Sequence, residues 1–152
     1  MLAVAAALLA GLSAAADAGP SVKELRSAPE TLTIDKIALK LEVYAWRDFQ
    51  PGLDAAPGGR PLRVVVKVTP SGGGNLPVGL TAVALYAVQG DEVWRPRGWE
   101  RNERTAAQIE AMAADGPKWA PGTKADVIVR LRDNAGGTHL LRAARQEIQR
   151  TD

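Results

Sequence analysis

The sequence predicts an all-β domain, most simply a single antiparallel β-sandwich of about seven strands. From Leu32 onwards, apolar and polar residues alternate with period two in several separate runs, which is typical of half-buried strands. Gly, Pro, Asn and Asp separate these runs, and long amphipathic helices do not alternate with them. A chain of 152 residues suits one such domain. A small β-barrel is the competing architecture.

Residues 1–18 predict a secretory signal peptide. The run from Leu2 to Leu12 is apolar and uncharged, too short to span a membrane but suited to a signal core. The small residues up to Ala18 then fit the A-x-A pattern of a cleavage site. We therefore expect a periplasmic or secreted protein. A buried Ala-rich helix is the alternative, because no basic residue precedes Lys23.

Residues 19–31 predict a linker or N-terminal arm, because they are polar, contain two prolines and show no periodicity. The first long strand is expected from Ile37 to Phe49. Its apolar residues share one face, on which Phe49 should join the core, and Arg47 on that face predicts a bulge or the rim of the sandwich. The opposite face carries Lys40, Glu42, Tyr44, Trp46 and Asp48.

The middle of the chain predicts three more strands. Leu62–Thr69 alternates cleanly, whereas Leu80–Val88 is apolar on both faces and indicates a central strand. Gln89–Glu92 is typical of a two-residue hairpin turn, with glycine first as a type II′ turn requires. The return strand begins at Val93–Trp94 and is limited by Pro96, which cannot donate to a β-ladder.

Arg104 to Asp115 is ambiguous from its sequence. Thr105 and Gln108 fit a helix capping box, but alternation is also present, and the neighbouring strands favour a strand here. The C-terminal region is clearer. It predicts a β-hairpin whose strands lie over residues 125–132 and 138–143, joined by the turn sequence DNAGG.

Several blocks carry a resemblance to a known group of proteins: YAWRDFQPG, GDEVW, GPKWAPG and DVIVRLRDNAGG. They resemble blocks of exported bacterial proteins that have an immunoglobulin-like or fibronectin III-like β-sandwich domain and no assigned function. The resemblance covers roughly Leu32 to Arg150 and implies one sandwich domain over residues 32–150. It implies no catalytic residue, because sandwiches carry many unrelated functions.

Composition argues against several classes of function. The formal net charge of +2 is low for a strongly cationic nucleic-acid binder. One histidine and no cysteine cannot supply a Cys/His metal site or a disulfide. No nucleophile motif or phosphate-binding loop is present. We therefore expect a non-enzymatic protein without a cofactor or a membrane span, as a monomer or weak oligomer.

The strongest candidate for function is the segment WRPRGWERNER, residues 94–104. It interleaves arginines with tryptophans, and this pairing is enriched at binding interfaces. In an exported protein it suggests an unknown protein or an anionic or glycan component of the envelope as partner. The alternative is a solvated loop whose glutamates offset part of its charge. With the outward aromatic pair of the first strand, the candidate binding residues are Tyr44, Trp46, Trp94, Arg95, Arg97 and Trp99.

Three rival functions remain open at this point. One is a protease-inhibitor-like sandwich that presents a loop such as Asp54–Arg60. Another is a carbohydrate-binding module, in which exposed aromatic rings stack on sugars. The third is an enzyme that uses only carboxylates, because Asp and Glu are scattered along the chain. Trp119, between two prolines, is expected to close one end of the sandwich with its indole N–H bonded to a partner.

Overall fold

The computed structural model describes residues 19–52 and 57–152 of the protein. The predicted signal peptide therefore lies outside the described residues, as does part of the Asp54–Arg60 loop. The described chain is mostly β, as predicted, with nine strands and one short helix, α2 (Val22–Ser27). The strands are β1 (Thr31–Ile34), β2 (Ile37–Asp48), β3 (Leu62–Pro70), β4 (Thr81–Gln89), β5 (Glu92–Trp94), β6 (Arg101–Arg104), β7 (Ile109–Gly116), β8 (Lys124–Arg132) and β9 (Thr138–Thr151).

The expected count of about seven strands is therefore too low for the described residues. The two strands that the sequence did not reveal are β1 and β6, each of four residues. In β6, Arg-Asn-Glu-Arg contains no apolar residue, so no alternation could mark it. In the ambiguous segment 104–115, Arg104 ends β6 and residues 105–108 form a turn, so the favoured strand is present only from Ile109 onwards, in β7. Thr105 and Gln108 close the β6–β7 turn instead of capping a helix, because the Thr105 hydroxyl accepts a hydrogen bond from the Gln108 N–H.

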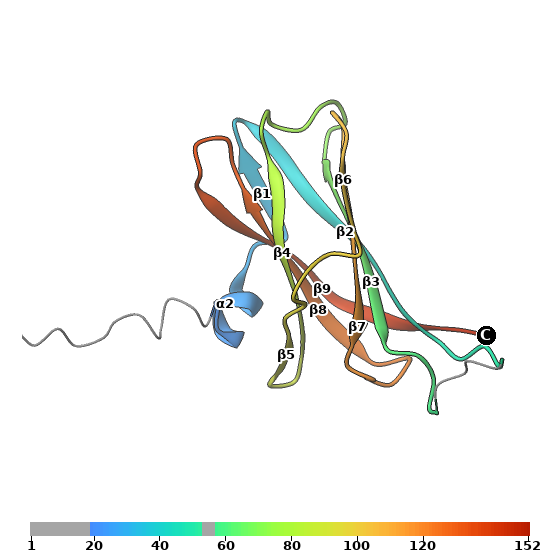
Figure 1. Ribbon diagram of the computed structural model, residues 1–152. Helices are drawn as coiled ribbons and strands as arrows, with labels where there is room; N and C mark the ends of the chain where they lie inside the picture. The colour runs from blue at the N-terminus through green and yellow to red at the C-terminus, as the bar shows by residue number, and fades with distance from the viewer. Residues whose placement is uncertain (1–18, 53–56) are drawn as a thin grey trace, which may run out of the picture.

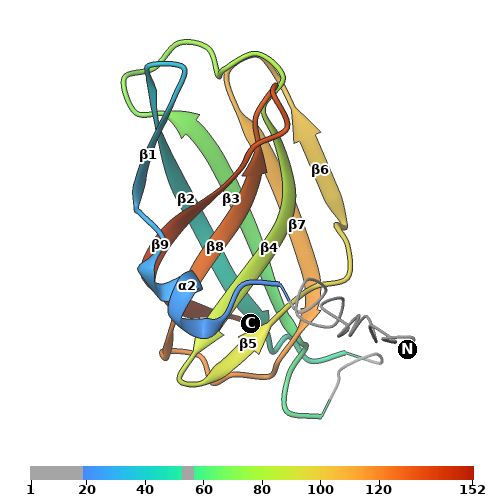
Figure 2. The same ribbon diagram turned by 90° about the vertical axis from the view of Figure 1, so that its left-hand side faces the viewer.

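All nine strands belong to one large sheet, in the order β5-β4-β8-β9-β2-β3-β7-β6, with β1 paired to β2. Every pair is antiparallel except β2 and β9, which run parallel from Ala45↔Ile148 to Asp48↔Thr151. Figures 1 and 2 show that the sheet forms two layers, with β4, β8 and β9 in front of β2, β3 and β7 in Figure 2. The parallel pair is where one layer continues into the other.

A single buried cluster fills the space between the two layers. The alternation predicted for β3 is confirmed, since Leu62, Val64, Val66 and Val68 are all buried in this cluster. The other layer contributes the inward residues of β4, β8 and β9. Burial of apolar surface of this kind is the main stabilising contribution to a domain of this size.

The N-terminal segment is not the loose arm that its polar composition predicted. Ser21 caps α2 by accepting a hydrogen bond from the Glu24 N–H, at 3.1 Å, which satisfies one free donor of the first turn. Leu25 is fully buried in a second apolar cluster, where it meets Tyr86 and Val88 of β4. This explains why β4 is apolar on both faces: one face joins the main core and the other lies under α2.

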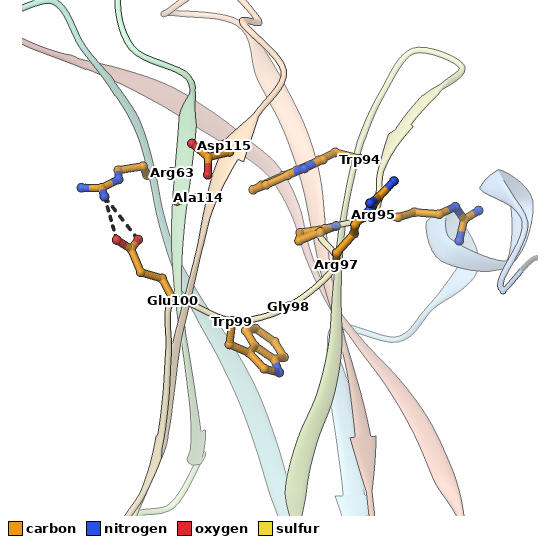
Figure 3. Close-up of a pocket in the computed structure, with 10 residues that line it drawn as sticks. Arg63, Trp94, Arg95, Arg97, Gly98, Trp99, Glu100, Ala114 and Asp115 are labelled. Carbon is orange, nitrogen blue, oxygen red and sulfur yellow. Dashed lines mark hydrogen bonds and ion pairs between the residues drawn. The ribbon is translucent and has the colours of Figure 1, made fainter. Parts of the chain in front are cut away.

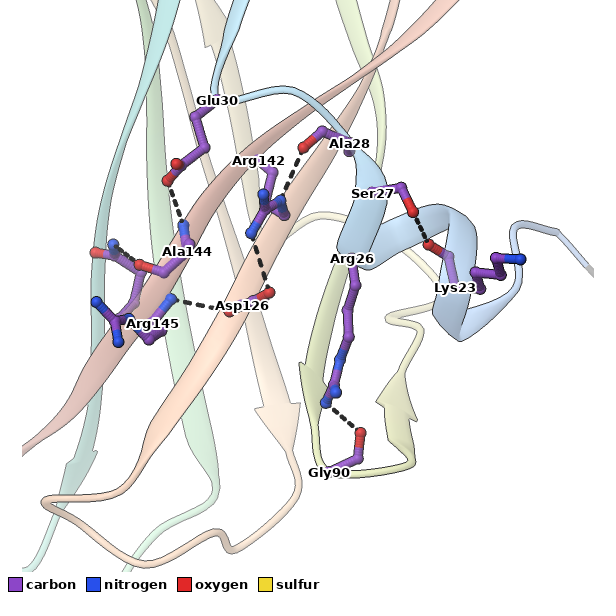
Figure 4. A network of polar contacts seen from close by, with 11 residues as sticks. Lys23, Arg26, Ser27, Ala28, Glu30, Gly90, Asp126, Arg142, Ala144 and Arg145 are labelled. Carbon is purple, nitrogen blue, oxygen red and sulfur yellow. Dashed lines mark hydrogen bonds and ion pairs between the residues drawn. The ribbon is translucent and has the colours of Figure 1, made fainter.

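Polar contacts fasten this arm to the last hairpin (Figure 4). Arg142 of β9 donates to the Ala28 carbonyl at 2.8 Å and lies 3.3 Å from a carboxylate oxygen of Asp126. Glu30 accepts a hydrogen bond from the Ala144 N–H. Because β8 and β9 both lie inside the sheet, Arg142 has no role in protecting a sheet edge. Arg142 instead holds the arm in place.

Two predicted turns are confirmed. Gln89 pairs with Glu92 across a two-residue loop, and Gly90 has φ +60, the left-handed value that the first position of a type II′ turn needs. In the last hairpin Asp133 accepts hydrogen bonds from two backbone N–H groups of its own turn. A hydrogen bond with His139 and these backbone donors lower the pKa of Asp133 below its ordinary value.

At the C-terminal end of β2, the positions of Phe49 and Arg47 differ from those expected from the sequence. Phe49 is half-buried and does not join the core. Two guanidiniums contact its ring, with their carbons 4.9 Å (Arg47) and 4.1 Å (Arg150) from the ring centroid. Arg47 is the buried residue, with 4 % of its surface exposed. Its guanidinium donates to carbonyls of the loops beyond the end of β2. The pairing of β2 with β3 shows no β-bulge near it, so of the two expectations the position at the end of the strand is the one that agrees with these contacts.

Candidate functional site

The segment from β5 to β6 borders a surface cavity of about 640 Å³ (Figure 3). The segment joins one layer of the sheet to the other, because β5 is at one end of the strand order and β6 at the opposite end. β3 and β7 supply the facing wall. The lining residues are Arg63, Trp94, Arg95, Pro96, Arg97, Gly98, Trp99, Glu100, Ala114 and Asp115.

Trp94 and Trp99 lie on different sides of this cavity (Figure 3). Both indoles are half-buried and pack against the main core, so each ring has one anchored part and one accessible part. Gly116 allows Trp94 to lie there, since a Cβ atom at Gly116 would come within 3.1 Å of the indole and 2.9 Å of the Leu62 Cβ. The rings are therefore held in fixed positions, which lowers the entropy lost on binding.

Three of the four arginines in the 94–104 segment already have partners in the protein. Arg95 donates to the Pro20 carbonyl and lies 5.5 Å from the Tyr86 ring, and Figure 3 shows it extending towards α2. Arg101 pairs with Glu110 at 2.7 Å. Arg104 donates to the carbonyls of residues 77, 80 and 105. These three side chains fasten the fold, so Arg95 is not an available ligand-binding group.

Arg97 is the exception in this segment. No hydrogen bond or ion pair joins its guanidinium to another residue in the described part of the chain, and its side chain is exposed. An exposed guanidinium beside two indoles provides up to five N–H donors and a planar surface for stacking. Arg97 is therefore the one arginine of the segment whose donors remain available at the cavity.

The wall opposite the tryptophans is polar and was not predicted from the sequence. Arg63 of β3 donates to both carboxylate oxygens of Glu100, at 2.9 and 3.3 Å. Asp115 lies near the end of β7 with φ +64, a left-handed conformation that aspartate tolerates better than most residues. In the sequence, Arg63 and Asp115 are recognisable only as charged residues near the ends of strands. Many surface residues have the same property, so it could not identify these two as part of a site.

Tyr44 and Trp46 lie on the outer face of β2, as predicted. Tyr44 is 50 % exposed, and its ring centroid is 5.2 Å from that of Trp46. Trp46 is half-buried and lines a second hollow of about 270 Å³. That hollow also contains Arg63 and Asp115, so these two residues line both hollows. The full lining of the second hollow is Trp46, Asp48, Arg60, Pro61, Arg63 and Asp115.

Trp119 has the structural role expected of it. Its side chain is buried in the main core, and its indole N–H donates to a carboxylate oxygen of Glu92. Its own carbonyl accepts a hydrogen bond from Arg47 at 3.1 Å. Trp119 is thus the one tryptophan that contributes to neither hollow.

The acid–base and metal-binding possibilities of the described residues are limited. Across residues 19–52 and 57–152, no three His, Asp or Glu side chains are grouped so that they could hold a metal ion. His139 lies at the last hairpin, bonded to Asp133 at 2.8 Å, and does not line the cavity. Within the same residues, no helix is both long and apolar enough to cross a membrane.

Comparisons with protein-family models, with curated proteins and with solved structures found no match to this chain.

Proposed function

We propose that this protein is an exported, non-enzymatic binding module of the bacterial envelope, and that its ligand binds in the cavity between Trp94, Arg97 and Trp99. One observation carries the proposal. Aromatic and basic residues that the sequence singled out line one cavity, and the anchored indoles leave part of each ring accessible there. Binding sites commonly combine such apolar surfaces with a few placed polar groups.

We further propose that the two layers form a β-sandwich of the immunoglobulin-like or fibronectin III-like class. Support comes from the core shared between the layers and from the antiparallel pairing of all neighbours except β2 and β9. In such domains, ligands commonly contact loops and connections rather than the buried sheet faces. The β5–β6 connection, which borders the cavity, is a segment of that kind.

The polar groups of the cavity favour binding over catalysis. Glu100 is held by Arg63, so its carboxylate is engaged in an ion pair. A general acid or base has to be within hydrogen-bonding reach of the reacting group, and a nucleophile needs a base beside it. The chain's one histidine, the usual base, is bonded elsewhere to Asp133.

A site-specific cross-linking experiment tests this proposal. A photoreactive phenylalanine analogue in place of Arg97, in the full chain expressed in a bacterial host, should yield adducts with an envelope component after irradiation of intact cells. The same analogue in place of Arg132, an exposed residue that does not line the cavity, is the control.

We expect adducts at position 97 and none of the same mass at position 132. Gel mobility, protease treatment and glycan staining then identify the class of the bound component. Equal labelling at both positions, or no adduct at position 97, would contradict a binding site in the cavity.

A further inference from the structure

The two hollows adjoin one another, which makes them a candidate surface for an extended ligand. Arg63 and Asp115 line both of them. A ligand long enough to extend from the cavity across these two side chains would therefore reach the hollow beside Trp46. Register places Trp46 next to Arg63 on neighbouring strands β2 and β3, and β7 with Asp115 follows β3. Two strand spacings cover roughly 10 Å, which exceeds the size of one sugar ring or one amino-acid side chain.

The charge of this surface is close to balanced. The two hollows contain four arginines, Arg60, Arg63, Arg95 and Arg97, and three carboxylates, Asp48, Glu100 and Asp115, which gives a formal net charge of +1. Glu100 offsets the charge of Arg63, and the guanidinium of Arg95, which keeps its charge, is directed away to the Pro20 carbonyl. A polyanion would need several unpaired cations and would be repelled by the carboxylates, so this surface is poorly suited to one.

The surface also provides hydrogen-bond donors and acceptors side by side. Guanidiniums only donate and carboxylates only accept, whereas a sugar hydroxyl does both. Aromatic rings lie at the two ends: Trp94 and Trp99 in the cavity, and Tyr44 beside Trp46 at the second hollow. Such rings present flat apolar faces next to polar groups. This combination suits a chain of hydroxyl-bearing rings.

We propose, on the basis of the binding function proposed above, that the ligand is an uncharged oligosaccharide of several rings lying across both hollows. The rings at one end stack on Trp94 and Trp99, and those at the other end on Trp46. Arg63, Asp115 and Arg97 bind the hydroxyl groups between them. An extended peptide is the competing ligand class, and the test below separates the two.

Chain-length dependence is the direct test. Full-length protein is titrated with uncharged hexasaccharides of β1,4-linked N-acetylglucosamine, β1,4-linked glucose and α1,4-linked glucose, and with the matching disaccharides. Tryptophan fluorescence and calorimetry measure the dissociation constants. At least one hexasaccharide should bind about tenfold or more tightly than its own disaccharide, because linked contacts add to affinity.

Substitutions at the two ends of the surface test which residues contact which part of the oligosaccharide. Trp46→Ala should weaken hexasaccharide binding by about tenfold and leave disaccharide binding unchanged, because a disaccharide occupies the cavity alone. Trp99→Ala should weaken both, and Trp99→Phe, which keeps a packed ring, should weaken them less and exclude misfolding as the cause. Val78→Ala, at an exposed position outside both hollows, is the matched control.

Three results would overturn the oligosaccharide proposal. These are no binding of any hexasaccharide at millimolar concentration, tighter binding of an acidic galacturonate hexamer, or hexasaccharide affinity that Trp46→Ala leaves unchanged. A protein adduct at position 97 together with no oligosaccharide binding would keep the binding module and reject its glycan ligand. The absence of both would reject the two proposals together.

Discussion

Replacing Arg47 with methionine is expected to lower the free energy of unfolding by about 3 kcal/mol. The guanidinium is buried and donates to the carbonyls of residues 58, 60, 118 and 119. Methionine fills much of the volume but removes the donor of these carbonyls. The Trp119 carbonyl is bonded inside the domain, where an unsatisfied acceptor is costly. Burial also lowers the pKa of the Arg47 guanidinium, and the loss of its four hydrogen bonds outweighs any relief from desolvation.

Urea denaturation followed by circular dichroism measures this loss. Arg47→Lys should be nearly as destabilising, because a single ammonium cannot reach four carbonyls arranged around a planar fork. Arg132→Met, at an exposed position, is the control and should change stability by no more than about 0.5 kcal/mol. If Arg47→Met and Arg132→Met had similar stabilities, Arg47 would not be joining these loops.

Replacing Leu25 with alanine is the second change with a large expected effect, a loss of about 3 kcal/mol. Leu25 is fully buried beneath α2, against Tyr86 of β4 and Ile128 of β8. Truncation leaves a cavity in this small cluster and weakens the contact that holds the arm. Thermal and urea unfolding of the full chain provide the measurement.

The matched control is Lys23→Ala, on the same helix at an exposed position, which should be close to neutral. Equal stability of the two variants would show that the arm contributes nothing to the folded domain. A loss confined to Leu25→Ala would establish that residues 19–31 belong to the domain rather than link to it.

The arm illustrates why some elements escape sequence reasoning. A helix of six residues spans fewer than two turns, so its apolar residues at helical spacing, Val22 and Leu25 followed by Ala28, are too few to establish a pattern. By contrast, β3 repeats its apolar residues four times on one face, and its strand was predicted with nearly correct ends. Local alternation therefore identified the long strands, whereas short elements held by tertiary contacts were missed.

The parallel pairing of β2 with β9 could not be predicted from local sequence patterns either. It joins Ala45 to Ile148, and nothing in either strand specifies a partner so distant in the chain. Parallel pairing depends on the path of the whole chain, which period-two patterns do not encode.

The candidate site likewise contains residues that the sequence could identify and residues that it could not. The run of tryptophans and arginines from Trp94 identified one wall of the cavity, because composition alone marks such a segment. The sequence could not tell which arginine was available, since the partners of Arg95 lie in the arm and in β4. Arg63 and Asp115 reach the cavity only through the register of β3 and β7.

The indole N–H signals of the four tryptophans in a nitrogen-15 proton correlation spectrum test the central claim most directly. Labelled full-length protein is mixed with soluble fragments released enzymatically from a bacterial envelope preparation. The signals of Trp94 and Trp99 should shift, while that of Trp119, buried and bonded to Glu92, should stay in place. Four unchanged signals, or a shift of Trp119 equal to those of Trp94 and Trp99, would contradict a ligand site in this cavity.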